Sequence, residues 1–530
     1  MKDQPNTPEV IIVGGGPCGL FAGLLLARKG VRCVVLEKKE GLSTHPKAMG
    51  ISRRTSEIFR QTGLLGHLEK GSLPLDGRCL GIWSKSLVGE ELGRIALADV
   101  TGPLTPCSTL HCPQTWTEHV IYEALKHEPL ASVQFGVNVE SVEATTTGAT
   151  IHLGDGTTLE SDWVLAADGA GSHLRKHLGI GTDGPGDLGH FVNVFFRANY
   201  GAKLEDRRAL LYQALGKDFF EFFVAVNGTD LWLMHHFLQP GETAEDFVAP
   251  DIQAVIQRAS GLPEEPIEVL GVSPWVMSPK VAKTWRHDRL LLVGDAAARL
   301  SPAGGLGLNN GLQSVHNLAW KLAGVINEGA SESLLDTYEL ERRSTALWLM
   351  KNTNRNADEI FVIVAAAMRD DWAAVRDGIS HSRRHGSGLG QDLGVIYDGG
   401  AFLPDGTEPT VNEDPVNDYH PSGRPGGRAP HVEIQNAGDK TSSLDFFGRG
   451  FVVLAGRAAG SFRADSQSAD FLQNGTEFES QAFEHTYGIT SAGAVLVRPD
   501  GVVAARFADS SGPETPDAVV SRVSKSGILT

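Results

Sequence analysis

The chain has 530 residues, of which 41% are hydrophobic and 21% are charged, and its formal net charge is −17 at pH 7. A chain of this length exceeds one ordinary hydrophobic core and predicts two or three folded domains. The negative charge argues against nucleic acid and anionic membrane surfaces as partners, because phosphate groups would be repelled. The polar N-terminal residues and the absence of a long apolar run predict a cytoplasmic protein that does not enter a membrane.

The five cysteines, at positions 18, 33, 79, 107 and 112, all lie in the first quarter of the chain. None of them forms a CxxC pair, and their odd number and spacing indicate neither a zinc site nor a disulfide framework. We therefore expect reduced, buried thiols and no metal site.

The first motif follows an apolar strand expected at residues 9–13 and reads Gly14-x-Gly16-x-x-Gly19. An Ala/Leu-rich helix comes next, then a second strand at 31–36 that ends at Glu37, which completes a dinucleotide-binding βαβ unit. The glycines permit a tight turn, close approach of a pyrophosphate and close packing of helix against strand. Glu37 is placed to accept hydrogen bonds from a ribose. We include Pro17, inside the motif, and Lys38, after the acid, among the predicted contacts.

Two later segments repeat the combination of a strand followed by an acid. In WVLAADGAGSHLRKHLGI (163–180) a strand ends at Asp168, and in RLLLVGDAAA (289–298) a strand ends at Asp295. The second segment continues into a loop containing Gly304, Gly305 and Gly307, before a helix expected to start near residue 309 or 310. Glycines at this density indicate that another molecule comes close to the backbone, and the two distant units indicate one long cofactor held at two places.

Residues 185–275 differ in character and predict an antiparallel sheet inserted into the nucleotide-binding domain. Two aromatic-rich runs in 218–237 are separated by Asn227-Gly228, a strong signal for a type I′ hairpin. With Val226 opposite Thr229, His235 shares one face with Phe220, Phe222, Val224, Leu231 and Leu233, and His236 shares the other with Phe219, Glu221, Phe223, Trp232 and Met234. Both faces are largely apolar, so we expect both to be covered, one of them in part by a substrate.

The predicted domains are therefore a dinucleotide-binding domain in two parts (1–184 and 276–380), the inserted sheet (185–275), a linker (381–425) and a C-terminal domain (426–530). Helices are expected at 311–328 and 332–376. Gly, Pro, Asp and His dominate 377–430, which is typical of a loop-rich linker. Strand-and-turn patterns such as GAVLVRPDGVVAARF predict a small α/β domain at the end of the chain.

In this order and spacing, GGGPCG, DGAGSHLR and GDAAARLSPAGGLGLNNGLQSVHNLAWKL resemble the motifs of class A FAD-dependent aromatic hydroxylases, the para-hydroxybenzoate hydroxylase-like family. The tail is similar to that of the phenol, chlorophenol and polyketide hydroxylase subgroup, which carries a thioredoxin-like C-terminal domain. The resemblance implies an α/β fold with a Rossmann-like FAD-binding domain, an inserted antiparallel substrate sheet and that C-terminal domain. The tail has no cysteine, which excludes a thiol redox role and leaves packing or homodimer formation.

The resemblance also assigns roles to single residues. Asp295 would bind the ribityl chain of FAD, Glu37 its adenosine ribose, and the backbone N–H groups of Leu308 and Asn309 the flavin ring. Lys47 and Gln114 stand where the family has flavin or phosphate contacts. Asp168, in the second motif, is included among the cofactor-binding residues.

The chemistry implied by the resemblance is reduction of FAD by NAD(P)H, reaction of the reduced flavin with O₂ to a C4a-hydroperoxide, and transfer of one oxygen atom to an aromatic, phenolic or polyketide-like molecule. Two residues depart from the family pattern: Ala298 stands where His is frequent, and Met49 where phenol hydroxylases often have Asp. The usual substrate-activating base is thus missing. His235 or His236, the latter beside Glu221, are the replacement candidates, ahead of Arg197 and Tyr212. Pro302 would present its carbonyl near the substrate.

Several alternatives use the same scaffold. Oxidative decarboxylation, epoxidation and Baeyer–Villiger insertion need the same activated oxygen, and they gain weight from the missing base. An O₂-independent FAD reductase would reduce its substrate without consuming O₂, and a non-catalytic flavin-binding protein would show slow flavin reduction with any aromatic compound. The aromatic-rich inserted sheet favours the monooxygenase.

Overall fold

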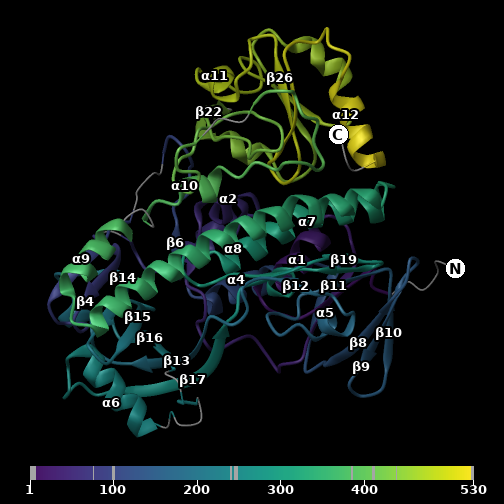
Figure 1. The fold of residues 1–530 in the computed structure, drawn as a ribbon. Helices are drawn as coiled ribbons and strands as arrows, with labels where there is room; N and C mark the ends of the chain where they lie inside the picture. Colours follow the sequence, from purple (N-terminus) through teal and green to yellow (C-terminus); the bar gives the residue numbers. More distant parts are fainter. Residues whose placement is uncertain are drawn as a thin grey trace.

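The structure is a computed structural model that describes residues 7–75, 77–97, 102–238, 241–243, 247, 249–382, 386–408, 412–436 and 438–526. It is an α/β fold with three parts: the nucleotide-binding domain, a large and mostly antiparallel sheet beside it, and a C-terminal domain on the opposite side of helices α7 and α8 (Figure 1). None of the helices in the described ranges combines the length and hydropathy needed to cross a bilayer.

The nucleotide-binding domain is built on a six-stranded sheet in the order β19-β20-β11-β1-β2-β7. Its five neighbouring strands from β20 to β7 run parallel, so their carboxyl ends meet at one edge, which is where ligands bind in such sheets. The strands are β1 (Val10–Val13), β2 (Cys33–Glu37), β7 (Ala131–Phe135), β11 (Trp163–Ala166), β19 (Arg286–His287) and β20 (Leu290–Leu292).

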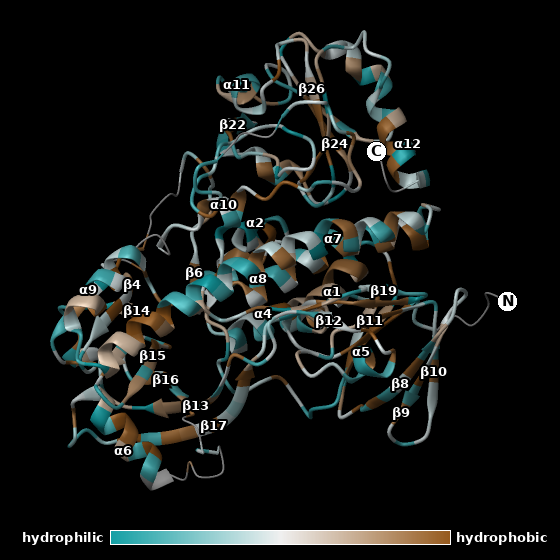
Figure 2. Cartoon of the chain, viewed as in Figure 1, coloured by the Kyte–Doolittle hydropathy of each residue, from teal (hydrophilic) through white to brown (hydrophobic). Residues whose placement is uncertain are grey.

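Helix α1 (Pro17–Arg28) packs between α4 (Gln114–Lys126) and α7 (Gly307–Asn327). The apolar strands and α1 form the largest buried core, which Figure 2 shows as hydrophobic colour through the centre of this domain. Smaller elements complete the domain: β3 (Gly50–Ile51), α2 (Arg53–Gln61), α3 (Leu65–Lys70), β6 (Leu110–His111), β8 (Val139–Ala144), β9 (Ala149–Leu153), β10 (Thr158–Ser161), α5 (His173–His177), β12 (Thr182–Asp183), β18 (Lys280–Ala282) and β21 (Ala298–Arg299).

The inserted sheet has seven strands in the order β17-β13-β16-β15-β14-β4-β5. They are β13 (Gly189–Arg197), β14 (Ala209–Leu215), β15 (Phe220–Ala225), β16 (Leu231–Phe237) and β17 (Glu268–Met277), joined by β4 (Cys79–Ser84) and β5 (Glu91–Ile95). The expected insertion at 185–275 is thus extended by two strands from the first part of the nucleotide-binding domain. The expected boundaries missed them because β4 pairs with β14, about 130 positions away. This pair is parallel, so the sheet is not antiparallel throughout as expected.

The hairpin at Asn227-Gly228 is present, but its turn differs from the expected type. Val226 faces Leu231 rather than Thr229, which leaves a four-residue loop. The side-chain oxygen of Asn227 accepts hydrogen bonds from the backbone N–H groups of Thr229, Asp230 and Leu231, which holds the wider loop. Because the register differs by two residues, an even number, the predicted faces are unchanged.

One face of the sheet is closed by helix α6 (Ala249–Ser260), whose Ile252 and Ile256 pack with Val194, Trp232 and Met234 in a fully buried cluster. On the other face, α9 (Trp372–His381) and the end of α8 (Ser333–Met368) cover Trp83, Leu215 and Phe220. The single helix expected at 332–376 is therefore two helices. Asp370 has a φ of 57°, and the Asp371 side chain caps α9 by accepting from the N–H of Ala374.

The C-terminal domain has a four-stranded sheet in the order β25-β24-β26-β27, in which only β24 and β25 are parallel. The succession strand, helical turn, strand, helix, strand, strand, helix in this order is the thioredoxin-like arrangement. Its elements are β24 (Val452–Ala455), a 3₁₀ turn (Gly460–Asp465), β25 (Asp470–Gln473), α11 (Phe483–Tyr487), β26 (Ala494–Val497), β27 (Val503–Phe507) and α12 (Pro516–Ser526), preceded by β22 (Glu433–Asn436) and β23 (Asp439–Ser442).

The predicted linker contains a short helix, α10 (Leu389–Leu393). Its Asp392 accepts hydrogen bonds from the N–H groups of Arg53 and Arg54, at 2.9 and 3.2 Å, and so satisfies the first turn of α2. This segment therefore packs against the nucleotide-binding domain instead of looping freely between the domains.

Candidate functional site

The turn between β1 and α1 can be made only by glycine. Gly14 has a φ of 112°, and a Cβ atom on it would lie 2.3 Å from the carbonyl oxygen of Ala167. A Cβ atom on Gly19 would lie 1.9 Å from the carbonyl oxygen of Gly14, whereas one on Gly16 would meet open space. Gly14 and Gly19 therefore allow the turn to pack against its own protein, and Gly16 leaves room for a ligand to approach the backbone.

The N-terminus of α1 faces that open space with unsatisfied donors. Gly16 is the N-cap without a side-chain hydrogen bond, Pro17 occupies the first turn, and the first helical bond runs from the N–H of Leu20 to the carbonyl of Gly16. The N–H groups of Cys18 and Gly19 are left for an anion, which is the arrangement that binds a pyrophosphate.

Glu37 lies at the end of β2, against this turn. Its Oε2 accepts a hydrogen bond of 2.6 Å from the N–H of Gly15, and its Oε1 accepts from the N–H of Lys39. A Cβ atom on Gly15 would lie 2.8 Å from the Cβ of Glu37, so the middle glycine of GGG is needed to admit the acid. The predicted motif left position 15 unspecified. Lys38 is exposed beside Glu37.

Lys47 and Gln114 meet in one turn. Lys47 is one of three non-glycine residues of positive φ in the described part of the chain, at 47°, and the N–H of Gln114 bonds to the carbonyls of Pro46 and Ala48 on either side of it. The Gln114 side chain donates to Glu118. Gln114 thus holds the backbone turn that exposes the Lys47 side chain, a geometry that costs energy and is typical of functional positions.

Asp295 follows β20 in a 3₁₀ turn (Gly294–Ala296). Its carboxylate is accessible to solvent and, among the described residues, accepts no hydrogen bond. The dense protein surroundings nevertheless raise the pKa of this carboxyl group by desolvation, and the nearby charges of Arg299 and Lys47 oppose the shift. A free acceptor in this setting suits a hydroxylated ligand.

Asp168 and Arg175 connect the second motif to the third. The Oδ2 of Asp168 accepts from the N–H of Leu174 and lies 3.2 Å from the Nδ1 of His173. Buried Arg175 donates a 2.8 Å hydrogen bond to the carbonyl of Ala296, next to Asp295. Asp168 thus orders the helix that carries Arg175, and a direct contact of Asp168 with the cofactor stays a prediction. The role of Arg175 was missed, although it belongs to DGAGSHLR.

The glycine loop leads into α7, which starts at Gly307, two to three residues earlier than expected. Gly304 and Gly305 have φ values of 137° and 68°, and the carbonyl of Pro302 accepts from the N–H of Gly305. No side chain caps α7, and its first helical bond is from the N–H of Asn310 to Leu306. The N–H groups of residues 307–309 are therefore free to stabilise negative charge on a ligand.

The side chain of Asn309 fixes this helix start. It accepts from the N–H of Ser52 at 2.8 Å and donates to the carbonyls of Gly50 and Gly305, and it is 2% exposed. The Asn309 amide therefore ties β3 to the glycine loop, in addition to the backbone role predicted for it.

These features fit an FAD molecule that extends from the β1–α1 turn to the start of α7. The open space at Gly16, the free carboxylate of Asp295 and the free N–H groups of Leu308 and Asn309 are complementary to its pyrophosphate, ribityl chain and flavin ring.

The inserted sheet turns the face bearing His235 toward Met49 of the nucleotide-binding domain. Met49 is 7% exposed and packs against Phe222, Val224 and Leu233. The position of the family's acid is thus filled by a thioether in an apolar cluster. Ala298, the second departure, is buried in β21.

His235 is held in place by neighbours on both sides in the sheet. Its Nδ1 lies 2.5 Å from the Oδ1 of Asn193, and the same oxygen accepts a hydrogen bond from the Nε1–H of Trp275. Phe222 contacts the other side of the ring at 5.5 Å between centroids. Burial, with the nearby His45, lowers the pKa of His235 to about 4, so the imidazole is neutral at pH 7.

The other candidates lie elsewhere. His236 points to the α6 face, where its Nδ1 lies 2.8 Å from Glu221 and its ring contacts Phe247. Tyr212 is on that same closed face and bonds to the backbone of Ala209 and Arg207. Arg197, at the end of β13, is ion-paired with Asp230 and Glu268. Of the four candidates, His235 alone lies on the face that is turned toward Met49, which we call the open face. The other three have structural partners.

His45, two residues before Lys47, is a neighbour that was not predicted. Its Nδ1 accepts from the N–H of Lys47, its ring contacts Phe195, and its buried Nε2 has no partner among the described residues. Desolvation lowers its pKa, so His45 is also neutral.

Comparison with known proteins agrees with this site. The model of the FAD binding domain matches residues 7–353, and that of the aromatic-ring hydroxylase C-terminal domain matches residues 422–524. The chain is 32% identical over 544 residues to aklavinone 12-hydroxylase of Streptomyces purpurascens, covering 97% of this chain and 98% of the relative.

Solved structures agree over the full length. The flavin-dependent monooxygenase PieE in complex with FAD and substrate superposes with a TM-score of 0.92 at 28% identity, over 98% of this chain and 99% of that chain. The ternary complex of aklavinone-11 hydroxylase with FAD and aklavinone gives 0.84 at 29% identity, over 99% and 100%. The chain therefore belongs to the family of FAD-dependent aromatic hydroxylases and is a monooxygenase with FAD as its cofactor.

Proposed function

We propose that this enzyme hydroxylates a polycyclic, phenolic molecule of the aromatic polyketide class, using O₂ and reducing equivalents from NAD(P)H. The observation that carries the proposal is the position of His235, a neutral imidazole in the middle of an aromatic face that is turned toward the nucleotide-binding domain. Relatives that are named putative polyketide hydroxylase and aklavinone hydroxylase support the substrate class.

The hydrogen-bond network fixes which nitrogen of His235 carries the proton. The indole Nε1–H of Trp275 can only donate, so the Asn193 atom that it meets must be the amide oxygen. That oxygen can only accept, so the Nδ1 of His235 must be protonated. The Nε2 of His235 therefore keeps its lone pair, and no described residue uses it. It is an acceptor for a phenol O–H.

With a pKa of about 4, His235 can accept a hydrogen bond from the phenol but is too weak a base to take up its proton fully. A general base is most effective when its pKa lies near the working pH, and this imidazole would hold a full proton only weakly. We infer that His235 accepts a hydrogen bond from the phenol and draws electron density onto the ring, which favours attack by an electrophilic oxygen at the ortho and para carbons.

The rest of the face suits a flat apolar molecule. Phe191, Phe195, Phe222 and Trp275 are half-buried on it, and Phe191 and Trp275 stack at 4.5 Å between centroids. Rings of this kind bind an aromatic plane and keep water away. Met49, packed among them, adds a polarizable surface in place of a charge.

When bound and reduced, FAD activates O₂ and supplies the oxygen atom. Glu37 would hold the adenosine ribose, Asp295 the ribityl chain, and Lys47 the flavin or a phosphate. The start of α1 would hold the pyrophosphate, and the N–H groups of residues 307–309 would hold the flavin. The carbonyl of Pro302, which is exposed at the turn before this helix, stays a candidate contact for the substrate.

The test uses the FAD-loaded protein with NADPH or NADH and a panel of anthracyclinones, simpler phenols and nitrocatechols. Consumption of NAD(P)H and O₂ should rise with a polycyclic phenol, and ¹⁸O₂ should add one labelled atom to the ring. His235→Gln should bind FAD and lose most product, whereas His236→Gln is the matched control on the closed face.

Other outcomes separate the alternatives. Labelled oxygen in a lactone, an epoxide or a decarboxylated product would replace hydroxylation by another oxygen transfer. Reduction of the aromatic compound without O₂ uptake would replace the monooxygenase proposal by a reductase. Equal product from His235→Gln and the native protein would exclude the role given to His235.

A further inference from the structure

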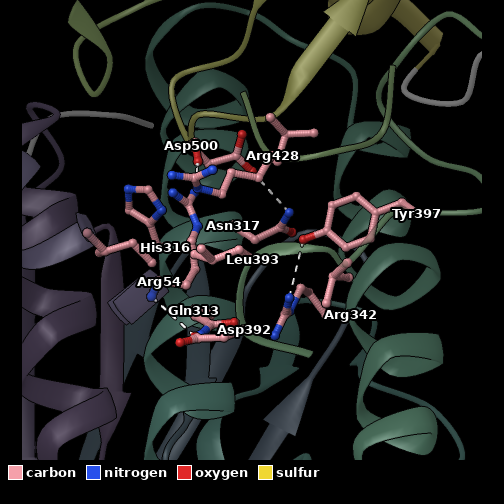
Figure 3. Close-up of a pocket in the computed structure, with 13 residues that line it drawn as sticks. Arg54, Gln313, His316, Asn317, Arg342, Asp392, Leu393, Tyr397, Arg428 and Asp500 are labelled. Atoms are coloured by element: carbon pink, nitrogen blue, oxygen red, sulfur yellow. Dashed lines mark hydrogen bonds between the residues drawn. The ribbon is translucent and has the colours of Figure 1, made fainter. Parts of the chain in front are cut away.

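A polar cavity lies between the FAD-binding domain and the C-terminal domain, away from the FAD site. The volume of this cavity is about 40 Å³. Side chains from α2, α7, α8, the α10 segment and the C-terminal domain line it (Figure 3). Its polar lining comprises Arg54, Gln313, His316, Asn317, Arg342, Asp392, Tyr397, Arg428 and Asp500.

Most of the charges around the cavity are paired. Glu57 binds both Arg54 and Arg428, and Asp392 lies 3.6 Å from Arg53. Glu341 pairs with both Lys321 and Arg498, and Arg498 also pairs with Asp500, in a fully buried network. Together with Arg342, these residues provide six cationic side chains and four carboxylates, an excess of two positive charges.

Arg342 is the cation without a carboxylate. It is 3% exposed and donates to three neutral oxygens, those of Ser314, Tyr397 and Asn310. No ion pair of Arg342 occurs within the described ranges. A guanidinium has five N–H donors, so two remain after these three bonds. A buried charge without a counter-charge is costly, and an anion in the adjoining cavity would remove that cost.

Two further donors face the cavity without acceptors. His316 is 8% exposed and makes no hydrogen bond to any described residue, while burial and the charge of Arg54 lower its pKa to about 3, so its ring is neutral and carries one N–H. The Tyr397 hydroxyl accepts from Arg342, but its own proton has no acceptor in the described structure. Figure 3 shows His316 beside Arg54 and Tyr397 beside Arg342.

We propose that this cavity binds one small anion, a halide or a carboxylate of formate size, held by Arg342 and Tyr397. The volume corresponds to about three water positions, which admits such an anion and excludes a nucleotide or a polyketide. The surplus of positive charge and the unused donors exclude a cation. Water alone would satisfy the donors but would leave the Arg342 charge uncompensated.

The anion would join two domains and reach the flavin-binding helix. Tyr397 belongs to the segment that leads into the C-terminal domain. Its backbone N–H donates a hydrogen bond to the carbonyl of Gly426. Arg342 holds the side chain of Asn310 in the first turn of α7. Binding should therefore stabilise the docking of the C-terminal domain together with the start of α7.

The direct test is anomalous diffraction from crystals of the FAD-loaded protein soaked in sodium bromide. A bromide peak inside the cavity, against Arg342 and Tyr397, is the expected result. Ordered water alone in the cavity at high bromide concentration would overturn the proposal.

The solution test compares thermal unfolding in sodium chloride, bromide or formate with sodium gluconate of equal ionic strength, since gluconate is too large to enter. The small anions should raise Tm in a saturable way. Tyr397→Phe, which removes one donor hydrogen, should weaken the apparent anion affinity about fivefold, the effect of one hydrogen bond. Tyr122→Phe, whose hydroxyl is remote from the cavity, is the matched control and should leave the affinity unchanged.

A second variant covers the case in which Tyr397→Phe retains the anion through its other contacts. Arg342→Lys keeps the charge but loses the planar donor set, and it should weaken halide and formate binding more strongly than Tyr397→Phe. Identical Tm titrations for the native protein, Tyr397→Phe and Arg342→Lys would overturn the proposal, and so would equal stabilisation of all of them by gluconate. None of these measurements depends on hydroxylation.

Discussion

His235 and His236 are neighbours in β16, but the two faces of the sheet give them opposite properties. His235 lies on the open face with neutral partners, and burial lowers its pKa to about 4. His236 lies on the closed face; burial opposes its charge, but Glu221 outweighs the burial and raises its pKa. The pKa of Glu221 is also raised by burial, so the pair shares a proton, and we assign that proton to His236 because it faces two carboxylates. The residue type alone therefore does not identify the functional histidine; the face does.

The largest expected effect is on the closed face. Trp232 is 1% exposed and packs against Tyr200 and Tyr212 at 5.6 and 5.9 Å between centroids. Trp232→Ala should lower the free energy of unfolding by about 3–5 kcal/mol, because it leaves a cavity in a closed core. Trp275→Ala on the half-buried face should cost less than half as much. Urea unfolding measures both, and equal losses would remove the distinction between the faces.

The next effect is on catalysis. His235→Gln should lower product formation about 100-fold, since it removes the neutral imidazole acceptor at the phenol, with little change in stability. His236→Gln should lower stability and leave the rate per folded molecule within a few-fold. Single-turnover product formation and urea unfolding on the same samples give both numbers. A larger catalytic loss in His236→Gln would contradict the assignment of the faces.

The extent to which the sequence predicts this molecule depends on how far apart the interacting residues are. The FAD-binding turn was predictable because Gly14, Gly16 and Gly19 act within a few positions, and a missing Cβ is visible in the sequence. The partners of His235 were not, because Asn193 and Trp275 are about 40 positions away on either side and meet it only in the folded sheet. The pairing of β4 with β14 and the cavity between the domains were not predictable for the same reason, because their residues are far apart in the sequence.

The faces of the sheet form an intermediate case. Alternation along the strand assigned His235 and His236 to opposite faces correctly, whatever the turn. The residues of β15 that share each face were also correct, because the change of register was even. The positions of α6 and Met49 decide which face is open. The sequence of the strand alone does not predict those positions. The break in the helix after residue 368 was missed because Asp370 adopts a positive φ that few non-glycine residues favour.

The two histidines should also give opposite pH dependences of stability. The folded pKa of His235 lies below the unfolded value of about 6.5, so as pH falls below 6.5 the unfolded state takes up the proton and stability is lost, by about 1.4 kcal/mol at pH 5.5. The folded pKa of His236 is raised, so its contribution is complete below pH 6.5 and is lost as pH rises through the folded pKa.

Subtracting the pH curve of the native protein's free energy of unfolding from that of each variant isolates the contributions of His235 and His236. Other buried histidines such as His111 contribute equally to every variant and cancel. Relative to the native protein, the free energy of unfolding of His235→Gln should increase as pH falls from 6.5 to 4. That of His236→Gln should increase as pH rises above 6.5. Parallel difference curves for the two variants would show that their surroundings are electrostatically alike.

The smallest effect tests how residues of the open face determine which ring nitrogen of His235 carries the proton. Trp275→Phe keeps the stacking on Phe191 but removes the donor that orients the Asn193 amide. A released amide can turn its NH₂ group toward His235, which would move the imidazole proton from Nδ1 to Nε2 and convert the phenol acceptor into a donor. We expect a five- to tenfold loss of product formation, about 1 kcal/mol, with flavin reduction and FAD affinity unchanged. ¹⁵N chemical shifts of His235 should report the change of tautomer. A slower rate with the Nδ1–H tautomer retained would mean that Trp275 acts through its contact with the substrate and not by orienting Asn193.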